Sequence, residues 1–131
     1  MEIKARAISR GRGAGEALLS TEPISFLGGI DPKTGDVIER GHPLEGKCVA
    51  GKVLIFPHGK GSTVGSYVML QLAENGKAPA AIINVSAEPI IAVGAIISGI
   101  PMVDKPEMDV FKLLKDGQRV EVDGDGGLII K

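Results

Sequence analysis

The sequence is poor in cysteine and in aromatic residues. It contains one cysteine, three phenylalanines, one tyrosine and no tryptophan among its 131 residues. A single cysteine excludes an internal disulfide and a cysteine-ligated metal or cluster site within the chain. The few aromatic rings leave no stacking platforms for single-stranded nucleic acid, and a net charge of −1 gives no bulk attraction to phosphate backbones.

The sequence also lacks a long hydrophobic run. Its longest apolar stretch extends from Pro89 to Pro101 and is interrupted by glycine, whereas a membrane-spanning helix needs about 20 apolar residues. The first residues, Met-Glu-Ile-Lys, do not have the pattern of a signal peptide. These features predict a cytoplasmic protein with no membrane partner.

The composition is that of a globular protein with an aliphatic core. Hydrophobic residues make up 44% of the chain and charged residues 24%, and a chain of this length builds one core. The 19 glycines and 8 prolines separate apolar segments, which is typical of many tight turns. We expect one domain over residues 1–131.

Hydrophobic periodicity predicts an α/β fold, with strands at both ends of the chain and alternating strands and helices in the middle. The segment Gly11–Gly15 is predicted to be a flexible basic loop. The hairpin turn Asp123–Gly127 joins the last two strands. The predicted strands cover 2–7, 16–21, 24–27, 47–56, 80–85, 100–103, 118–122 and 128–131, and the predicted helices 62–74, 88–98 and a helical turn within 106–114.

The segment Pro57–Tyr67 has the strongest functional pattern in the chain. A strand, a glycine-rich loop and a helix N-terminus direct backbone N–H groups at one point. The loop is not a phosphate-binding P-loop, because no glycine stands five residues before Gly59 and Gly61 follows Lys60. It is not a nucleophile elbow either, because Val64 stands where that motif needs glycine.

Ser62 stands where the helix is expected to begin, and two interpretations are open. It can be an N-cap whose oxygen accepts a hydrogen bond from the Gly65 N–H, or it can be a reactive group. Lys60 can be a solvated loop charge or a ligand for an anion. Thr63 and Ser66 can be surface or capping hydroxyls.

Several segments together resemble the small subunit of the aconitase X family. They are Phe26–Gly35, His42–Gly46, Gly59–Tyr67 and Glu88–Asp104. The resemblance covers nearly the whole chain in order. It implies a swivelling β/β/α domain, partly barrel-like, that covers the active site of an aconitase-like enzyme.

The resemblance also implies an activity and a partner. The chain would be the small subunit of a hydro-lyase, active only with a large subunit that carries a [4Fe–4S] cluster. The expected reaction removes water from (R)-5-phosphomevalonate to give trans-anhydromevalonate 5-phosphate in the modified mevalonate pathway, with Ser62 as proton acceptor. Two alternatives stay open: a dehydratase acting on cis-3-hydroxy-L-proline, and a non-catalytic binding or scaffold domain.

A serine needs help to act as a base. A helix N-terminus stabilises an alkoxide by about 0.3–1 kcal/mol, or ~2 when partly buried. At roughly 1.4 kcal/mol per pKa unit, this lowers the pKa of a serine hydroxyl far too little for neutral pH. Further cationic groups must come from Lys60, the large subunit or the metal site. We therefore expect the chain alone to be inactive.

Arg10 and Arg12 are candidates for binding the substrate phosphate or carboxylate, because guanidinium groups pair with both in a bidentate manner. A solvated basic turn is the alternative. Lys60, Gly61 and Thr63 are further candidates, and a partner surface is expected as an apolar or glycine-rich face near 59–66. Other polar residues are given structural or undefined roles: His42, His58, Cys48, Asp31 and Asp104.

Overall fold

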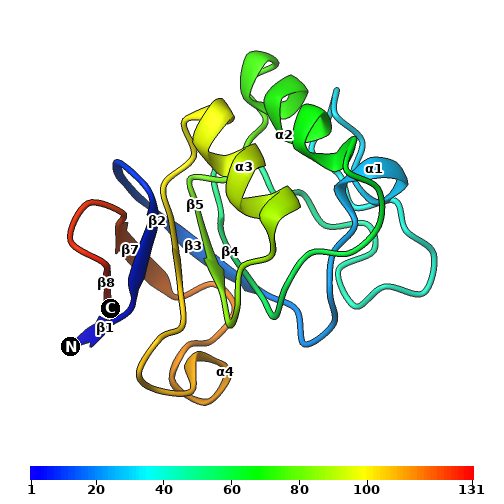
Figure 1. Cartoon of the computed structure of the whole chain (residues 1–131). Coiled ribbons are helices and arrows are strands. Elements are labelled where there is room, and N and C mark those ends of the chain that lie inside the picture. Colours follow the sequence, from blue (N-terminus) through cyan, green and yellow to red (C-terminus); the bar gives the residue numbers. More distant parts are fainter.

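The computed structural model describes all residues, 1–131, and has a mixed sheet flanked by helices (Figure 1). The strand order is β1-β8-β7-β3-β4-β5-β6-β2. The strands are β1 Glu2–Lys4, β2 Arg6–Ser9, β3 Arg12–Leu19, β4 Val53–Phe56, β5 Ala81–Asn84, β6 Met102–Asp104, β7 Arg119–Asp123 and β8 Leu128–Ile130. The helices are α1 Phe26–Gly29, α2 Gly65–Glu74, α3 Pro89–Ser98 and α4 Val110–Leu113.

The sheet curls until its two edges meet, which confirms the α/β, partly barrel-like fold. Strands β1 and β2 stand at opposite ends of the strand order, yet only Ala5 separates them in the chain. The Ala5 N–H donates to the Gly127 carbonyl at 2.8 Å and continues the pairing of β1 with β8. The predicted single strand over 2–7 is therefore two strands that pair with different neighbours.

Parallel strands form the centre of the sheet. Strand β4 pairs in parallel with β3 and β5, and β5 pairs in parallel with β6. Helices α2 and α3 are the crossover connections, and both lie over the same face of these strands (Figure 1). Every residue of β4 and β5 is buried, as expected for parallel strands covered on both faces.

The two crossover helices pack closely because α3 contains a glycine. A Cβ at Gly94 would overlap the thioether of Met69 in α2. Helix α3 begins at Pro89 after a capping residue, Glu88, whose carboxylate accepts from the N–H groups of Ile90 and Ile91. The predicted bounds of this helix are confirmed within one residue.

The predicted flexible loop at Gly11–Gly15 is wrong, because most of it belongs to β3. A Cβ at Gly13 would overlap the Ala80 carbonyl, and one at Gly15 would overlap the Gly51 carbonyl. These glycines allow neighbouring backbone to approach the strand. They do not provide flexibility.

Two predicted strands are shorter or absent. Residues 26–29, labelled α1, form a turn in which Leu27 (ψ 117°) and Gly28 (φ 80°) have non-helical dihedral angles, and Ile24 makes only an isolated bridge to Gly59. The predicted strand 47–56 is regular only over Val53–Phe56, since the residues before it form turns and one isolated bridge between Asp36 and Cys48.

The two ends of the chain lie side by side (Figure 1). Strands β1 and β8 are antiparallel, and the Met1 ammonium donates to the Lys131 carbonyl at 3.2 Å. None of the helices has the length and apolar character needed to cross a membrane.

Candidate active site

The glycine-rich loop leaves the end of β4 and enters α2. Its first half pairs with a distant segment: the Ile24 N–H donates to the His58 carbonyl at 3.3 Å, and the Lys60 N–H donates to the Ile24 carbonyl at 3.0 Å. A Cβ at Gly59 would overlap Ile91 and lie 2.6 Å from the Glu88 carboxylate. The loop is therefore held between residues 23–25 and the beginning of α3.

Ser62 is exposed and lies three residues before the first residue of α2. Its Oγ accepts a hydrogen bond from the Val64 N–H at 3.1 Å, and its carbonyl accepts from the Gly65 N–H at 3.0 Å. The predicted cap bond from Oγ to the Gly65 N–H is wrong, because α2 begins later than expected. The hydroxyl thus remains accessible beside a helix N-terminus.

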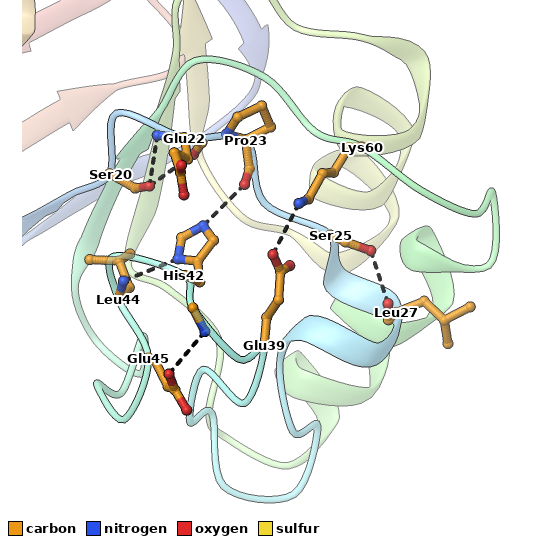
Figure 2. Close-up of polar contacts among 11 residues, drawn as sticks. Ser20, Glu22, Pro23, Ser25, Leu27, Glu39, His42, Leu44, Glu45 and Lys60 are labelled. Carbon is orange, nitrogen blue, oxygen red and sulfur yellow. Dashed lines mark hydrogen bonds and ion pairs between the residues drawn. The ribbon is translucent and has the colours of Figure 1, made fainter.

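Lys60 is paired with an acidic residue that the sequence analysis did not single out. Its Nζ lies 3.0 Å from Glu39 Oε2 (Figure 2). Both side chains are partly exposed, and an ion pair of this kind contributes only about 0.2–1 kcal/mol. A substrate anion could therefore replace Glu39 at little cost.

The hydroxyl of Ser25 lies against Gly61, the residue before Ser62. The φ of Gly61, +94°, favours glycine, and a Cβ there would lie 2.6 Å from Ser25 Oγ. Ser25 Oγ donates to the Leu27 carbonyl at 2.9 Å (Figure 2). Ser25 has no local sequence signal, because only the tertiary pairing of Ile24 with Gly59 brings it to the loop.

An apolar groove adjoins the loop between α2 and α3. It has a volume of about 380 Å³, and Tyr67 at its edge is 64% exposed. No charged residue occurs between Lys60 and Glu74 or between Glu88 and Asp104. The apolar face expected near residues 59–66 is therefore present. Its lining residues are Thr63, Ser66, Tyr67, Pro89, Ile90, Val93 and Ile97.

Arg12 lies far from Ser62. It begins β3, which runs parallel to β4 with Ala17 opposite Val53, so Arg12 and the loop after Phe56 lie towards opposite ends of these strands. Its Nη2 is 3.2 Å from Asp123 Oδ2. The pKa of Asp123 is lowered, chiefly by the Gly126 N–H, with smaller contributions from the Asp125 N–H and Arg12.

Arg10 belongs to the same end as Arg12. It lines a hollow of about 460 Å³ with Ala7, Ile8, Gly124 and Asp125. Lys60, Gly61 and Thr63 flank Ser62 in the chain, whereas the two arginines lie towards the opposite end of the strands. Substrate binding by Arg10 and Arg12 stays a prediction without support from their placement.

The residues of this chain do not fit an iron–sulfur cluster. No group of three or more His, Cys, Asp and Glu side chains could hold a metal ion. The one cysteine, Cys48, lies 3.5 Å from the Thr34 carbonyl as a free thiol. His58 is exposed and its Nδ1 lies 2.7 Å from the Gly59 carbonyl.

Comparison with known proteins agrees with this architecture. Residues 2–130 match the family model of the aconitase X swivel domain. The phosphomevalonate dehydratase small subunits of Methanothermobacter thermautotrophicus and Methanocella arvoryzae are 62% and 64% identical over 129 residues, covering 98% of this chain and 98% of each relative.

A solved structure shows the same fold at high similarity. The crystal structure of Thermococcus kodakaraensis aconitase X in its holo-form superposes with a TM-score of 0.93 at 53% identity. The match covers 98% of this chain and 96% of that chain. With a family model that spans nearly every residue, the chain belongs to the aconitase X family and forms its swivel domain.

Proposed function

We propose that this chain is the small subunit of a phosphomevalonate dehydratase. The reaction would remove water from (R)-5-phosphomevalonate to give trans-anhydromevalonate 5-phosphate in the modified mevalonate pathway. The observation that supports this most directly is the identity of 62–64% to small subunits of that name over almost the entire chain. Residues 1–131 would act as one swivelling domain in the cytoplasm.

Ser62 is the proposed proton acceptor. Its exposed Oγ can take a proton from the carbon next to the substrate carboxylate, while hydroxide leaves the neighbouring carbon and a C=C bond forms. Lys60 and the N-terminus of α2 would stabilise the charged form of the serine. The backbone of Gly61 and the hydroxyl of Thr63 would bind substrate oxygens.

The remaining groups would come from a large subunit. We propose that this partner carries the [4Fe–4S] cluster, because the side chains of the small subunit provide no ligand set for one. The apolar groove beside Thr63 and Ser66 supports docking of the partner next to Ser62. Apolar faces of this kind often mark protein interfaces.

The proposal is tested by co-expression with the large subunit and an anaerobic assay of the purified complex. Dehydration of 5-phosphomevalonate, absent from each subunit alone, is the expected result. Dehydration of cis-3-hydroxy-L-proline instead would assign the other substrate. A complex that converts neither compound would leave a binding or scaffold domain.

A further inference from the structure

His42 is a buried histidine whose two ring nitrogens are both used. Its Nδ1 lies 3.0 Å from the Leu44 N–H nitrogen, and its Nε2 lies 3.0 Å from the Pro23 carbonyl oxygen (Figure 2). Because the Leu44 N–H can only donate, Nδ1 must accept and carry no proton. The neutral ring therefore has its proton on Nε2, which donates to Pro23.

The carbonyl that His42 binds belongs to the segment that supports the glycine-rich loop. Pro23 directly precedes Ile24, which makes two backbone hydrogen bonds with residues 58 and 60. Ser25 follows and packs against Gly61. Only Gly61 stands between Lys60 and Ser62 in the chain, so a displacement of Pro23 would be passed to Ser62 through a short run of backbone contacts.

The turn that contains His42 contacts the loop a second time. Glu39, three residues earlier, forms the ion pair with Lys60. Within the turn, Glu45 Oε1 accepts from the Gly41 N–H at 3.1 Å and the His42 carbonyl accepts from the Glu45 N–H at 3.0 Å. Hydrogen bonds within the turn 39–45 therefore hold it together. The turn contacts the loop region twice: His42 binds Pro23, beside the segment that pairs with the loop, and Glu39 binds Lys60.

We propose that His42 is a positioning residue for Ser62: its Nε2–H bond to Pro23 fixes the segment 23–25, and this segment fixes the loop 58–61. The inference rests on the proposed role of Ser62 as proton acceptor. His42 does not contact Ser62 and takes no part in the chemical step. Its effect on catalysis comes from geometry, since a misplacement of about 1 Å can reduce a rate by roughly a hundredfold.

Two substitutions separate the two hydrogen bonds of His42. In His42→Asn, the amide oxygen can still accept from the Leu44 N–H, but the shorter side chain loses Pro23. In His42→Gln, the terminal NH2 can donate to Pro23, while the bond to Leu44 is lost. The first variant therefore removes the contact that the proposal needs, and the second retains it.

The first measurement is kinetic and uses the complex with the large subunit. We expect His42→Asn to lower kcat about tenfold, with KM changed less than about twofold, and His42→Gln to retain most of kcat. In a Ser62→Ala background, His42→Asn should cause no further loss. The proposal would be overturned if His42→Asn and His42→Gln lowered kcat equally. It would also be overturned if His42→Asn lowered kcat as much in the Ser62→Ala variant as in the wild type.

The second measurement is amide hydrogen exchange on the full chain without substrate. The Lys60 amide, bonded to Ile24, should exchange about tenfold faster in His42→Asn and at the wild-type rate in His42→Gln, while amides within α2 stay protected. An unchanged Lys60 amide in His42→Asn contradicts the proposal. If Ser62→Ala proved fully active, the proposed function of Ser62 would fail, and exchange would still decide whether His42 holds the loop.

Discussion

The Lys60 ammonium lies 3.0 Å from the Glu39 carboxylate, so the cation nearest to Ser62 in the sequence already has an acidic partner. In the proposed enzyme, a substrate anion has to compete with Glu39 for this lysine. Breaking the ion pair between Lys60 and Glu39 costs little free energy because both side chains reach solvent. Glu39 would then neutralise the loop when no substrate is bound.

This relationship predicts opposite effects for the two partners. Lys60→Met should raise KM for the phosphorylated substrate roughly tenfold or more, because a hydrogen bond to a charged group contributes about 1.5–3 kcal/mol. Glu39→Gln should lower KM, because it frees the lysine. Initial rates of the two-subunit complex provide the measurement, and a KM that is unchanged in both variants would exclude Lys60 from substrate binding.

Ser62→Ala should abolish turnover without weakening the fold. Loss of a general base typically costs about 10²–10⁴ in rate, whereas an exposed side chain with one hydrogen bond changes stability by roughly 0.5 kcal/mol or less. Thr34→Ala is a matched control, because Thr34 Oγ1 likewise accepts from the N–H two residues later, in Asp36. Turnover and urea unfolding of both variants should separate a catalytic role of Ser62 from a structural role of its hydrogen bond to the Val64 N–H. Substantial activity in Ser62→Ala would leave Ser62 without a catalytic function.

Gly61→Ala should disturb the loop more than its positive φ alone would. A left-handed conformation costs a non-glycine residue about 1–2 kcal/mol, and the new Cβ would also meet Ser25 Oγ. Gly41→Ala is the control, since Gly41 has a φ of +79° and open space around the added Cβ. We expect Gly61→Ala to lower the free energy of unfolding at least as much as Gly41→Ala does, and to have a much lower kcat. Equal kcat values for the two variants would show that the added Cβ at position 61 does not disturb the geometry that catalysis needs.

The groove between α2 and α3 predicts where the large subunit binds. Ile97→Glu places a charge in the groove and should weaken association at least tenfold, because burying an unpaired charge is unfavourable. Met108→Glu is the control: both residues are 46% exposed, but Met108 lies near α4 and outside the groove. Subunit titration with each variant tests this. If Ile97→Glu instead abolished self-association of this chain and left the heteromeric complex intact, the groove would bind a second copy.

The lowered pKa of Asp123 predicts a loss of stability in acid. A carboxyl whose pKa is lower in the folded state than in the unfolded state stabilises the fold above its unfolded pKa of about 3.9. This stabilisation disappears as the pH falls through the lower, folded value. Asp123→Asn should therefore be less stable than wild type at pH 7, and the difference should narrow at pH 3. Urea unfolding at the two pH values is the measurement, and a constant difference would contradict the assignment.

The central strands and both long helices could be predicted from the sequence. An apolar run broken only by Asn84 marks β5 because both faces of that strand are covered. The capping carboxylate of Glu88 and the glycine at 99 mark the ends of α3. The glycines of β3 misled the prediction. The close approach of Ala80 and Gly51 to this strand depends on tertiary packing, and no local pattern reveals it.

The site was only partly predictable for the same reason. Ser62 stands out because strand, loop and helix follow one another in the chain. Glu39 and His42 reach the loop or its support through contacts between residues 21 and 19 positions apart, which no short motif encodes. The parallel register of β3 with β4 places Arg12 towards the opposite end of these strands from the loop of Ser62, and substrate binding by Arg10 and Arg12 stays a prediction.

The adjacent ends of β1 and β8 have a consequence for engineering. A short linker could join residue 131 to residue 1, and the chain could be reopened at an exposed turn such as Asn75–Gly76. Such a circular permutant would keep every strand pairing, and its new chain ends, where a label can be attached, would lie at the C-terminal end of α2. A fluorophore or tether placed there could then test the proposed rotation of the domain without a label beside Ser62.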